Sequence, residues 1–200
     1  MAVDFLVLAN SIKHGNRCLA GIVNPFSQNP VWCRLVSDAN GGALANNLPI
    51  LGKGILADLN PLDIVSVALG QAVPLNGQPE NIILDTSDKI IYKRTVNKSN
   101  LNAFIQSPDD IWGTDSISEL NHSGPSLMLL NVNNPQKNTT YKNYPSLSFD
   151  YNSIHYNIRC TVENFSYIII PQNLKTCIIC VSSGTVYKGS YYKFVAGVIF

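Results

Sequence analysis

The chain of 200 residues carries little charge, because Asp, Glu, Lys and Arg together make up only 14% of it, against about 25% in typical soluble domains. The formal net charge is +1, which argues against strong non-specific binding to nucleic acid. No apolar run approaches the ~20 residues of a membrane span, and the short apolar stretch at residues 5–9 follows an aspartate, unlike a secretory signal. We therefore expect a cytoplasmic protein with no membrane partner. Its sparsely charged surface permits a homo-oligomer or a protein partner.

The motifs of common catalytic and metal sites are also missing. Gly52-Lys53-Gly54 lacks the rest of a phosphate-binding loop, and there is no nucleophile elbow or metalloprotease helix. The odd number of cysteines, five, fits a reducing compartment, and the three histidines are far apart. Cys177 and Cys180 form a CxxC inside an expected strand, where residues three apart face opposite sides and cannot hold one metal ion. We expect no enzyme activity, no metal and no cofactor.

Signals for β-strands dominate what remains. Short runs rich in Val, Ile and Tyr alternate with Gly, Asn and Pro turns at the spacing of barrels or sandwiches. One short helix is expected at residues 100–106, with Ser99 or Asn100 as its cap and Pro108 after its end. The segment 38–61 is weaker and is expected to hold a short helix or an irregular loop. The expected strands are residues 3–9, 17–23, 31–36, 62–69, 81–84, 89–96, 126–132, 146–150, 154–159, 167–170, 174–181 and 191–199.

The fold class that follows is all-β, with one or two short helices and with strands spaced as in small antiparallel barrels or sandwiches. The first three strands are arranged in sequence like a meander, the usual beginning of such a barrel. The long-loop region 97–124 is the natural seam between two units of similar size. We place the first barrel and its connecting helix at residues 1–118 and the second barrel at residues 119–200.

The stretch 10–38 contains the most informative side chains. Two apolar strands carry it, yet it brings Lys13, Arg17, Trp32 and Arg34 close together in sequence. Arg offers a rigid fork to phosphates and base edges, and an exposed Trp offers a stacking platform worth about 1–3 kcal/mol per base. We predict that these residues face solvent together as a recognition surface. The alternative is an Arg–Trp stack that only covers the polar face of a barrel.

Two further segments are candidates for the same surface. Glu80 could pair with one of the arginines and Asn81 could reach a ligand, although both could instead cap the end of a strand. Residues 187–193 interleave Tyr and Lys, so Tyr191 and Lys193 suit a single-stranded nucleic acid, and they equally suit an ordinary two-faced strand. Residues 1–37, 38–136 and 137–200 carry net charges of +2, −5 and +4. A basic face is therefore possible if the fold brings the two ends together, and chance scatter is the alternative.

Several short motifs follow one another along nearly the whole chain and together resemble one known family. The order of these motifs, rather than any single one, is similar to the bacterial dual OB-containing domain family. The resemblance implies two OB-like barrels in tandem and a role in nucleic-acid binding, without catalytic activity. The motifs are Ala9-Asn10-Ser11 with Lys13, Arg17-Cys18-Leu19-Ala20-Gly21, Trp32 with Arg34, Leu62-Asp63-Ile64-Val65, Gln78-Pro79-Glu80-Asn81 and Tyr192-Lys193-Phe194-Val195-Ala196.

The function predicted from the sequence is a non-enzymatic nucleic-acid-binding module that recognises a single strand or an end. Lys13, Arg17, Arg34 and Lys193 would contact phosphates, while Trp32 and Tyr191 would stack on bases. One alternative is a protein-interaction or adaptor module that forms an oligomer or pairs with an effector. Another is a pocket for a nucleotide-like small molecule held by Arg34 and Glu80. The choice between DNA and RNA stays open.

Overall fold

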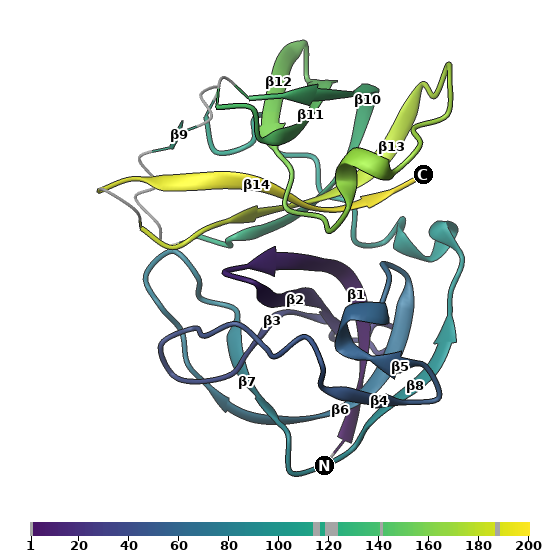
Figure 1. Ribbon diagram of the computed structural model, residues 1–200, viewed down its shortest axis with the longest axis vertical. Helices are drawn as coiled ribbons and strands as arrows, with labels where there is room; N and C mark the ends of the chain where they lie inside the picture. Colours follow the sequence, from purple (N-terminus) through teal and green to yellow (C-terminus); the bar gives the residue numbers. More distant parts are fainter. Residues whose placement is uncertain (1, 114–116, 119–123, 141, 187–188) are drawn as a thin grey trace.

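The computed structural model describes residues 2–113, 117–118, 124–140, 142–186 and 189–200. Two β units lie one above the other, with β1 to β8 in the lower unit and β10 to β14 in the upper one (Figure 1). The helices in the described residues are short 3₁₀ turns. The predicted all-β class is therefore confirmed. No helix in these ranges has the length and apolar character that crossing a membrane requires.

The lower unit contains a closed barrel of five strands. β3 lies beside β7 in parallel, while the other neighbours are antiparallel, and the pairing of β6 with β1 closes the ring. This order, first-second-third-fifth-fourth and back to the first, with strands counted along the barrel, is that of an OB-type Greek-key barrel. The barrel strands are β1 (Ala2–Lys13), β2 (Asn16–Val23), β3 (Val31–Val36), β6 (Asp63–Ala72) and β7 (Asn81–Asp85).

Three further strands and one turn extend this barrel. β8 pairs with β6, β4 pairs with β8, and β5 pairs with β4. The buried Asn10 anchors the turn that follows, because its Nδ2 donates hydrogen bonds of 2.9 and 2.8 Å to the carbonyl oxygens of Leu56 and Leu59. The additional elements are β4 (Pro49–Leu51), β5 (Gly54–Ile55), η1 (Leu56–Asp58) and β8 (Ile90–Thr95).

The upper unit repeats the same pairing order with a looser closure. Its sheet runs β12-β11-β10-β13-β14-β9, and Cys160, directly after β12, forms an isolated parallel bridge with Val195 of β14. The third and fifth strands of this unit thus meet in parallel, as β3 and β7 do in the first. The elements are β9 (Ile117–Ser118), β10 (Leu127–Thr139), β11 (Pro145–Tyr151), β12 (Ile154–Arg159), η3 (Phe165–Tyr167), β13 (Thr176–Ser183) and β14 (Tyr191–Ile199).

The two units share a buried apolar interface. Along β1, Phe5 and Val7 point into the first barrel, while Leu6 and Leu8 point into the interface. Because both faces are buried, β1 reads as a continuous apolar run rather than an alternating one. Gly197 of β14 lies so close to β1 that a Cβ atom added there would be 2.1 Å from the Leu8 carbonyl oxygen. The interface core comprises Leu6, Leu8, Ala9, Ala20, Ile22, Ile64 and Leu101 from the lower part, and Leu127, Leu129, Ile178, Cys180, Ala196 and Ile199 from the upper.

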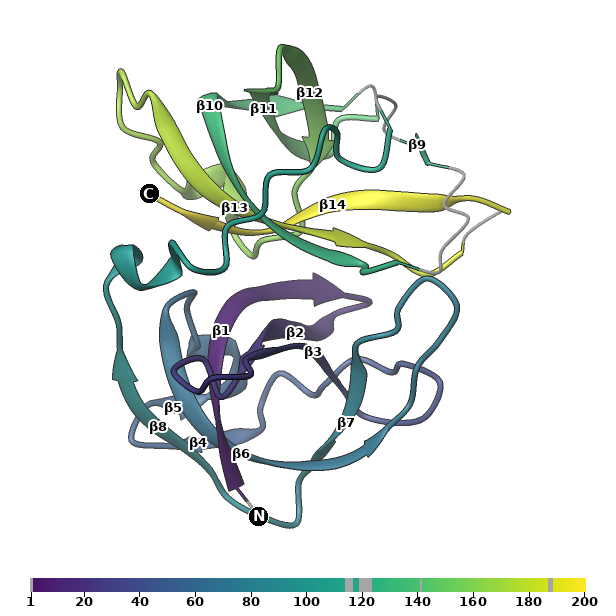
Figure 2. The same ribbon diagram turned by 180° about the vertical axis from the view of Figure 1, so that it is seen from behind.

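Two of the expected elements differ in the structure. The helix predicted at residues 100–106 is a 3₁₀ turn, η2 (Lys98–Leu101), after which the chain crosses to the upper unit (Figure 2). The strand predicted at residues 167–170 is wrong, because Tyr167 ends η3 and residues 168–170 have no regular secondary structure. The division predicted at residue 118 stays a prediction. β9, which precedes this division in sequence, pairs with β14 of the upper unit. Gln106, which also precedes it, exchanges two hydrogen bonds with Leu129 of β10.

Candidate functional site

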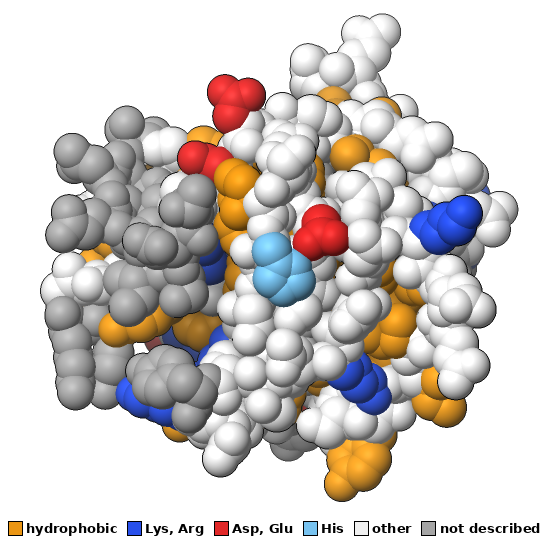
Figure 3. Space-filling view, turned by 90° about the horizontal axis from the view of Figure 1, so that it is seen from above, with side chains coloured by type: hydrophobic (Ala, Val, Ile, Leu, Met, Phe, Trp, Pro, Cys, Tyr) orange, Lys and Arg blue, Asp and Glu red, His pale blue; other side chains and the backbone are white. Residues whose placement is uncertain are grey.

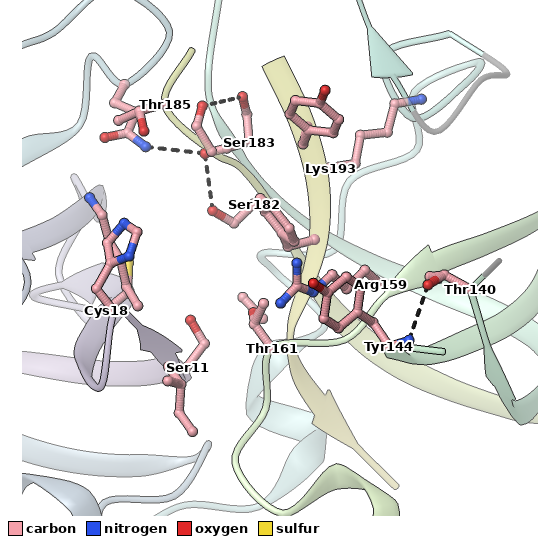
Figure 4. Close-up of a pocket in the computed structure, with 18 of the residues that line it drawn as sticks. Ser11, Cys18, Thr140, Tyr144, Arg159, Thr161, Ser182, Ser183, Thr185 and Lys193 are labelled. Carbon is pink, nitrogen blue, oxygen red and sulfur yellow. Dashed lines mark hydrogen bonds between the residues drawn. The ribbon is translucent and has the colours of Figure 1, made fainter. Parts of the chain in front are cut away.

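A cleft of about 660 Å³ lies at the seam between the two units. The first unit contributes the end of β1, the turn into β2 and Gln78 from the loop before β7. The second unit contributes the loop between β10 and β11, the outer side of β12 and the ends of β13 and β14. In Figure 4, Ser11 and Cys18 face Arg159, Tyr144 and Thr140 across the opening. The cleft therefore exists only because the two units pack together.

Positive charge is concentrated in this cleft. Its described lining includes Lys13, Lys142, Arg159 and Lys193 but neither Asp nor Glu. The two sequence segments with a net positive charge, residues 1–37 and 137–200, both contribute side chains to this cleft. On the face of the molecule drawn in Figure 3, the charged side chains are few and are separated by uncharged surface. The cleft is thus the local exception on a sparsely charged protein.

Arg159 and Tyr144 form the most distinctive contact of the cleft. The Arg159 Cζ lies 3.9 Å from the centroid of the Tyr144 ring and 6.0 Å from that of Phe194. The Tyr144 side chain is 43% exposed, so its ring is accessible. Within the described part of the chain the Arg159 guanidinium makes these ring contacts but no hydrogen bond or ion pair, so its N–H groups are available to a ligand.

Strand alternation explains why Arg159 points outward. On β12, Tyr156 and Ile158 belong to the core of the second unit, whereas His155, Asn157 and Arg159 are exposed. A strand directs successive side chains to opposite faces. One face of β12 is therefore a polar stripe that ends in Arg159 at the cleft.

Lys13 is held at the cleft wall by a tight turn. His14 and Gly15 both have positive φ, 51° and 78°, which is the signature of a two-residue hairpin turn. The Lys13 Nζ donates to the Gly41 carbonyl oxygen at 2.8 Å. The pKa of nearby Asp38 lies below its usual value because the backbone N–H groups of Asn40 and Gly42 donate to it, with smaller contributions from the Ser37 hydroxyl and Lys13. Asp38 therefore stays ionised and supports the turn that accepts Lys13.

Lys193 lines the cleft with its stem but directs its ammonium elsewhere. Its Nζ donates to the Gly113 carbonyl oxygen at 2.6 Å and lies 5.8 Å from the Tyr156 ring centroid. Figure 4 shows the side chain extending away from Ser11 and Cys18. The other predicted residue of this strand, Tyr191, is buried, so the expectation that it is exposed for base stacking is wrong. Tyr187 and Lys188, which belonged to the same predicted surface, lie outside the described residues.

Arg34 is not a surface residue, which corrects the central expectation from the sequence. Its side chain is 1% exposed, and its Nη2 donates to Ser126 Oγ and Ser182 Oγ at 3.0 Å each and to the Ser183 carbonyl oxygen at 3.3 Å. Glu80 accepts hydrogen bonds of 2.6 and 2.7 Å from the N–H and hydroxyl of Ser126. Glu80 therefore reaches Arg34 through Ser126 rather than by a direct ion pair. All these partners of Arg34 lie in the second unit or bridge to it.

The other predicted residues of the first unit are also buried or half-buried. Arg17 is 2% exposed; it forms an ion pair with Glu163 and donates to Asn46 Oδ1 at 3.0 Å. Trp32 packs against the interface core. The fully buried Asn81 donates to Gln78 Oε1 at 3.5 Å. The prediction that Arg17, Trp32 and Arg34 form one open patch is wrong, because the second unit covers the outer face of β2 and β3.

Of the eight predicted residues, only Lys13 and Lys193 line the cleft. The sequence analysis missed Arg159, Lys142 and Tyr144 as candidate site residues. The alternation of apolar and polar residues at 154–159 was a usable signal for Arg159, because it marks one outward face. Lys142 and Tyr144 lie in a loop and its border, where no periodicity identifies them.

The cysteines and histidines do not build a metal site among the described residues, where no three His, Cys, Asp or Glu side chains gather closely enough. Cys177 lies in the core of the second unit and Cys180 in the interface, which confirms that they face opposite sides of β13. Burial raises the pKa of Cys33, Cys160, Cys177 and Cys180 to about 12. These thiols are therefore inert, while the half-buried Cys18 borders the cleft.

Comparison with known proteins gives one match. The family model described as the dual OB-containing domain matches residues 3–198, which is nearly the whole chain. No curated protein and no solved structure matches significantly.

Proposed function

Since this chain belongs to the dual OB-containing domain family, a family of binding modules, we propose that it binds single-stranded nucleic acid in the cleft between its two barrels. In this role the protein acts as a non-enzymatic binding module. The ligand would lie against Arg159, Tyr144 and Lys142 of the second unit and Lys13 of the first. Arg34, which the sequence alone favoured as a ligand contact, instead donates hydrogen bonds to Ser182 and Ser183 of the cleft wall.

The observation that carries the proposal is the place of the cleft in the second barrel. OB barrels bind oligonucleotides on the face of their second and third strands and with the loops after the first and fourth. In the second unit these parts are β11, β12 and the loops that follow β10 and β13, and the last three of them line the cleft. In the first barrel the equivalent face, formed by β2 and β3, packs on the second unit. The cleft thus coincides with the OB binding region that remains open.

The chemistry of the lining favours the same ligand. Tyr144, Tyr192 and Phe194 provide aromatic rings, on which bases of any sequence can stack. The cations and hydroxyl groups around them supply hydrogen-bond donors for phosphates, and the described lining contains no carboxylate that would repel them. The volume, about 660 Å³, is within the usual range of ligand pockets, roughly 300–1,000 Å³.

The proposal is tested by titrating a fluorescently labelled single-stranded oligonucleotide and measuring anisotropy. We expect Arg159→Ala to weaken binding by about tenfold or more, since both a charge and part of a stacking platform are lost. Arg94→Ala is the matched control, because Arg94 also lies over an aromatic ring, that of Phe26 at 5.6 Å, but outside the cleft. If Lys13, Lys142 and Arg159 contact three phosphates, log affinity should fall against log salt with a slope of about −2. Equal losses in both variants, or a flat salt response, would contradict the proposal.

A nucleotide-like small molecule is the second candidate, because the cleft is partly enclosed between two units. A panel of mononucleotides in a thermal-shift experiment separates the two candidates. A mononucleotide that stabilises the protein as strongly as an oligonucleotide would select the small-molecule function. A gain in affinity from mononucleotide to short oligonucleotide would select the nucleic acid.

A protein-interaction role is favoured by a different feature, the loop after β12. Tyr167 and Ile169 are each 84% exposed there, although large apolar side chains are usually at least partly covered. Measurement of the molar mass in solution tests this role. A stable oligomer that has no affinity for oligonucleotides would select it over the nucleic-acid proposal.

A further inference from the structure

The first barrel stands across one side of the cleft, and this arrangement restricts how a strand can lie in it. We propose that the cleft receives the end of a single strand rather than an interior segment, and that it favours a terminal phosphate. This inference rests on the proposed nucleic-acid function and adds to it which part of the nucleic acid is recognised. It follows from two hydrogen-bonded crossings between the units and from the charge at the wall between them.

The first crossing joins the end of β1 to the segment after β12. Ser11 forms an antiparallel bridge with Val162, and the Ile12 N–H donates to the Thr161 carbonyl oxygen at 2.9 Å. Ser11, Ile12 and Thr161 all line the cleft. The backbone is therefore hydrogen-bonded across the seam at this point, and no opening is left there for a polynucleotide chain.

The second crossing joins the loop before β7 to the end of β13. Gln78 Nε2 donates to the Ser183 carbonyl oxygen at 3.2 Å, and Arg34 donates to the same oxygen. Gln78 and Ser183 also line the cleft, and both Gln78 and Arg34 are buried. This contact fixes the wall of the first unit at a second place, next to the buried interface.

The two crossings make the cleft asymmetric. On the side of the second unit it continues into the exposed polar stripe of β12, from Arg159 to Asn157 and His155. On the side of the first unit it meets the hairpin that contains Ser11, Lys13 and His14. A nucleic-acid strand that lies along β12 can leave the cleft outward at one side. At the other side the hairpin of the first unit blocks its path, so the nucleic acid must end there.

The wall carries a charge that suits a terminal phosphate. Lys13 lies in it, and although the ionised Asp38 is near Lys13, Asp38 does not belong to the described lining, which contains no carboxylate. A phosphate monoester carries about −1.5 to −2 charges at neutral pH, whereas an internal diester carries one. A terminal phosphate beside Lys13 therefore gains more attraction than an internal phosphate would.

The decisive experiment compares a circular single strand with the linear strand of identical sequence and length. We expect the linear strand to compete at least about tenfold better against a labelled oligonucleotide bound to the full chain. Equal competition by the circle would overturn end recognition while leaving nucleic-acid binding intact. If neither competes, the proposed function itself fails, so the two failures are distinguishable.

A second experiment tests the contribution of the wall. Linear strands with a terminal phosphate, at either end, are compared with strands that end in hydroxyl groups. A phosphate at one of the two ends should make the strand bind about threefold to tenfold more tightly to the wild-type protein than the strand with hydroxyl ends. Lys13→Ala should remove that preference. Lys89→Ala, which changes an exposed lysine away from the cleft, should keep it. An unchanged preference in Lys13→Ala with a normal melting temperature would overturn the role of Lys13.

Discussion

The Nη2 atom of Arg34 lies 3.0 Å from the hydroxyl oxygen of Ser182, although the two residues belong to different barrels. The same Nη2 binds Ser126, whose N–H and hydroxyl are held by Glu80. The positive charge of the buried Arg34 is therefore placed at the seam, and the Glu80 carboxylate balances it indirectly, through Ser126 of the second unit. Because Ser182 and Ser183 also line the cleft, the cluster that joins the barrels also fixes part of the cleft wall.

Loss of Arg34 should destabilise the protein as a whole. Arg34→Met removes three hydrogen bonds and leaves Glu80 without the charge that balances it, so we expect the free energy of unfolding to fall by about 2–4 kcal/mol. Urea denaturation measures this. Arg94→Met, on a more exposed arginine, should cost less than about 0.5 kcal/mol. Equal stability of Arg34→Met and the wild type would show that the cluster does not join the barrels.

The close approach of β14 to β1 gives a second prediction. In Gly197→Ala the new Cβ would meet the Leu8 carbonyl oxygen at 2.1 Å, so the strands must separate, and we expect a loss of about 1–3 kcal/mol in thermal or urea unfolding. Gly124→Ala is the matched control, since a Cβ there meets nothing within 4 Å. A Gly197→Ala protein as stable as the control would mean that the two units are not packed as described.

The sequence was sufficient for the class of fold but not for the location of the site. Strand periodicity and turn residues predicted most strands, because each strand has one face in a core. In the structure Trp32 and Arg34 lie on the face of β3 opposite Cys33 and Leu35, as the alternation of side chains along a strand requires. This alternation could not show that the second barrel covers that face, because an interface residue and a solvent-exposed residue follow the same alternation.

The cleft depends on contacts between residues far apart in sequence. Lys13 and Arg159 both line the cleft because the end of β1 is hydrogen-bonded to the segment after β12, a long-range pairing that no local pattern encodes. Arg17 and Arg34 looked like ligand contacts because charged side chains on strands are usually exposed. They are instead buried with Glu163 and with the serines of the second unit.

Cys18 should be the reactive thiol of this protein. The other four cysteines have their pKa raised to about 12 by burial, so only about one in 10⁴ of each is thiolate at pH 8. Cys18 is partly exposed and borders the cleft. Iodoacetamide labelling of the native protein followed by mass spectrometry should modify Cys18 first, and a bound oligonucleotide should slow this reaction about fivefold or more. Uniform labelling of the cysteines would contradict the selective reactivity of Cys18, and a lack of protection by the oligonucleotide would place the ligand elsewhere.

The Tyr144 ring should contribute to ligand affinity through stacking rather than through its hydroxyl group. Tyr144→Phe keeps the ring beneath Arg159 and should bind an oligonucleotide nearly as well as the wild type. Tyr144→Ala removes the ring and should lose about 1–3 kcal/mol of binding free energy, the usual value for one base–aromatic contact. Anisotropy titrations of both variants measure the difference. Comparable losses in both would assign the effect to the hydroxyl, and no loss in either would remove Tyr144 from the site.

The most direct test of the shared cleft is photocrosslinking of a single-stranded oligonucleotide that contains a photoreactive pyrimidine, followed by identification of the modified peptides. The structure predicts crosslinks at the aromatic residues of the cleft, Tyr144, Tyr192 and Phe194, and their loss in the presence of excess unlabelled strand. Crosslinks confined to Phe26 or Tyr167, outside the cleft, would contradict the account.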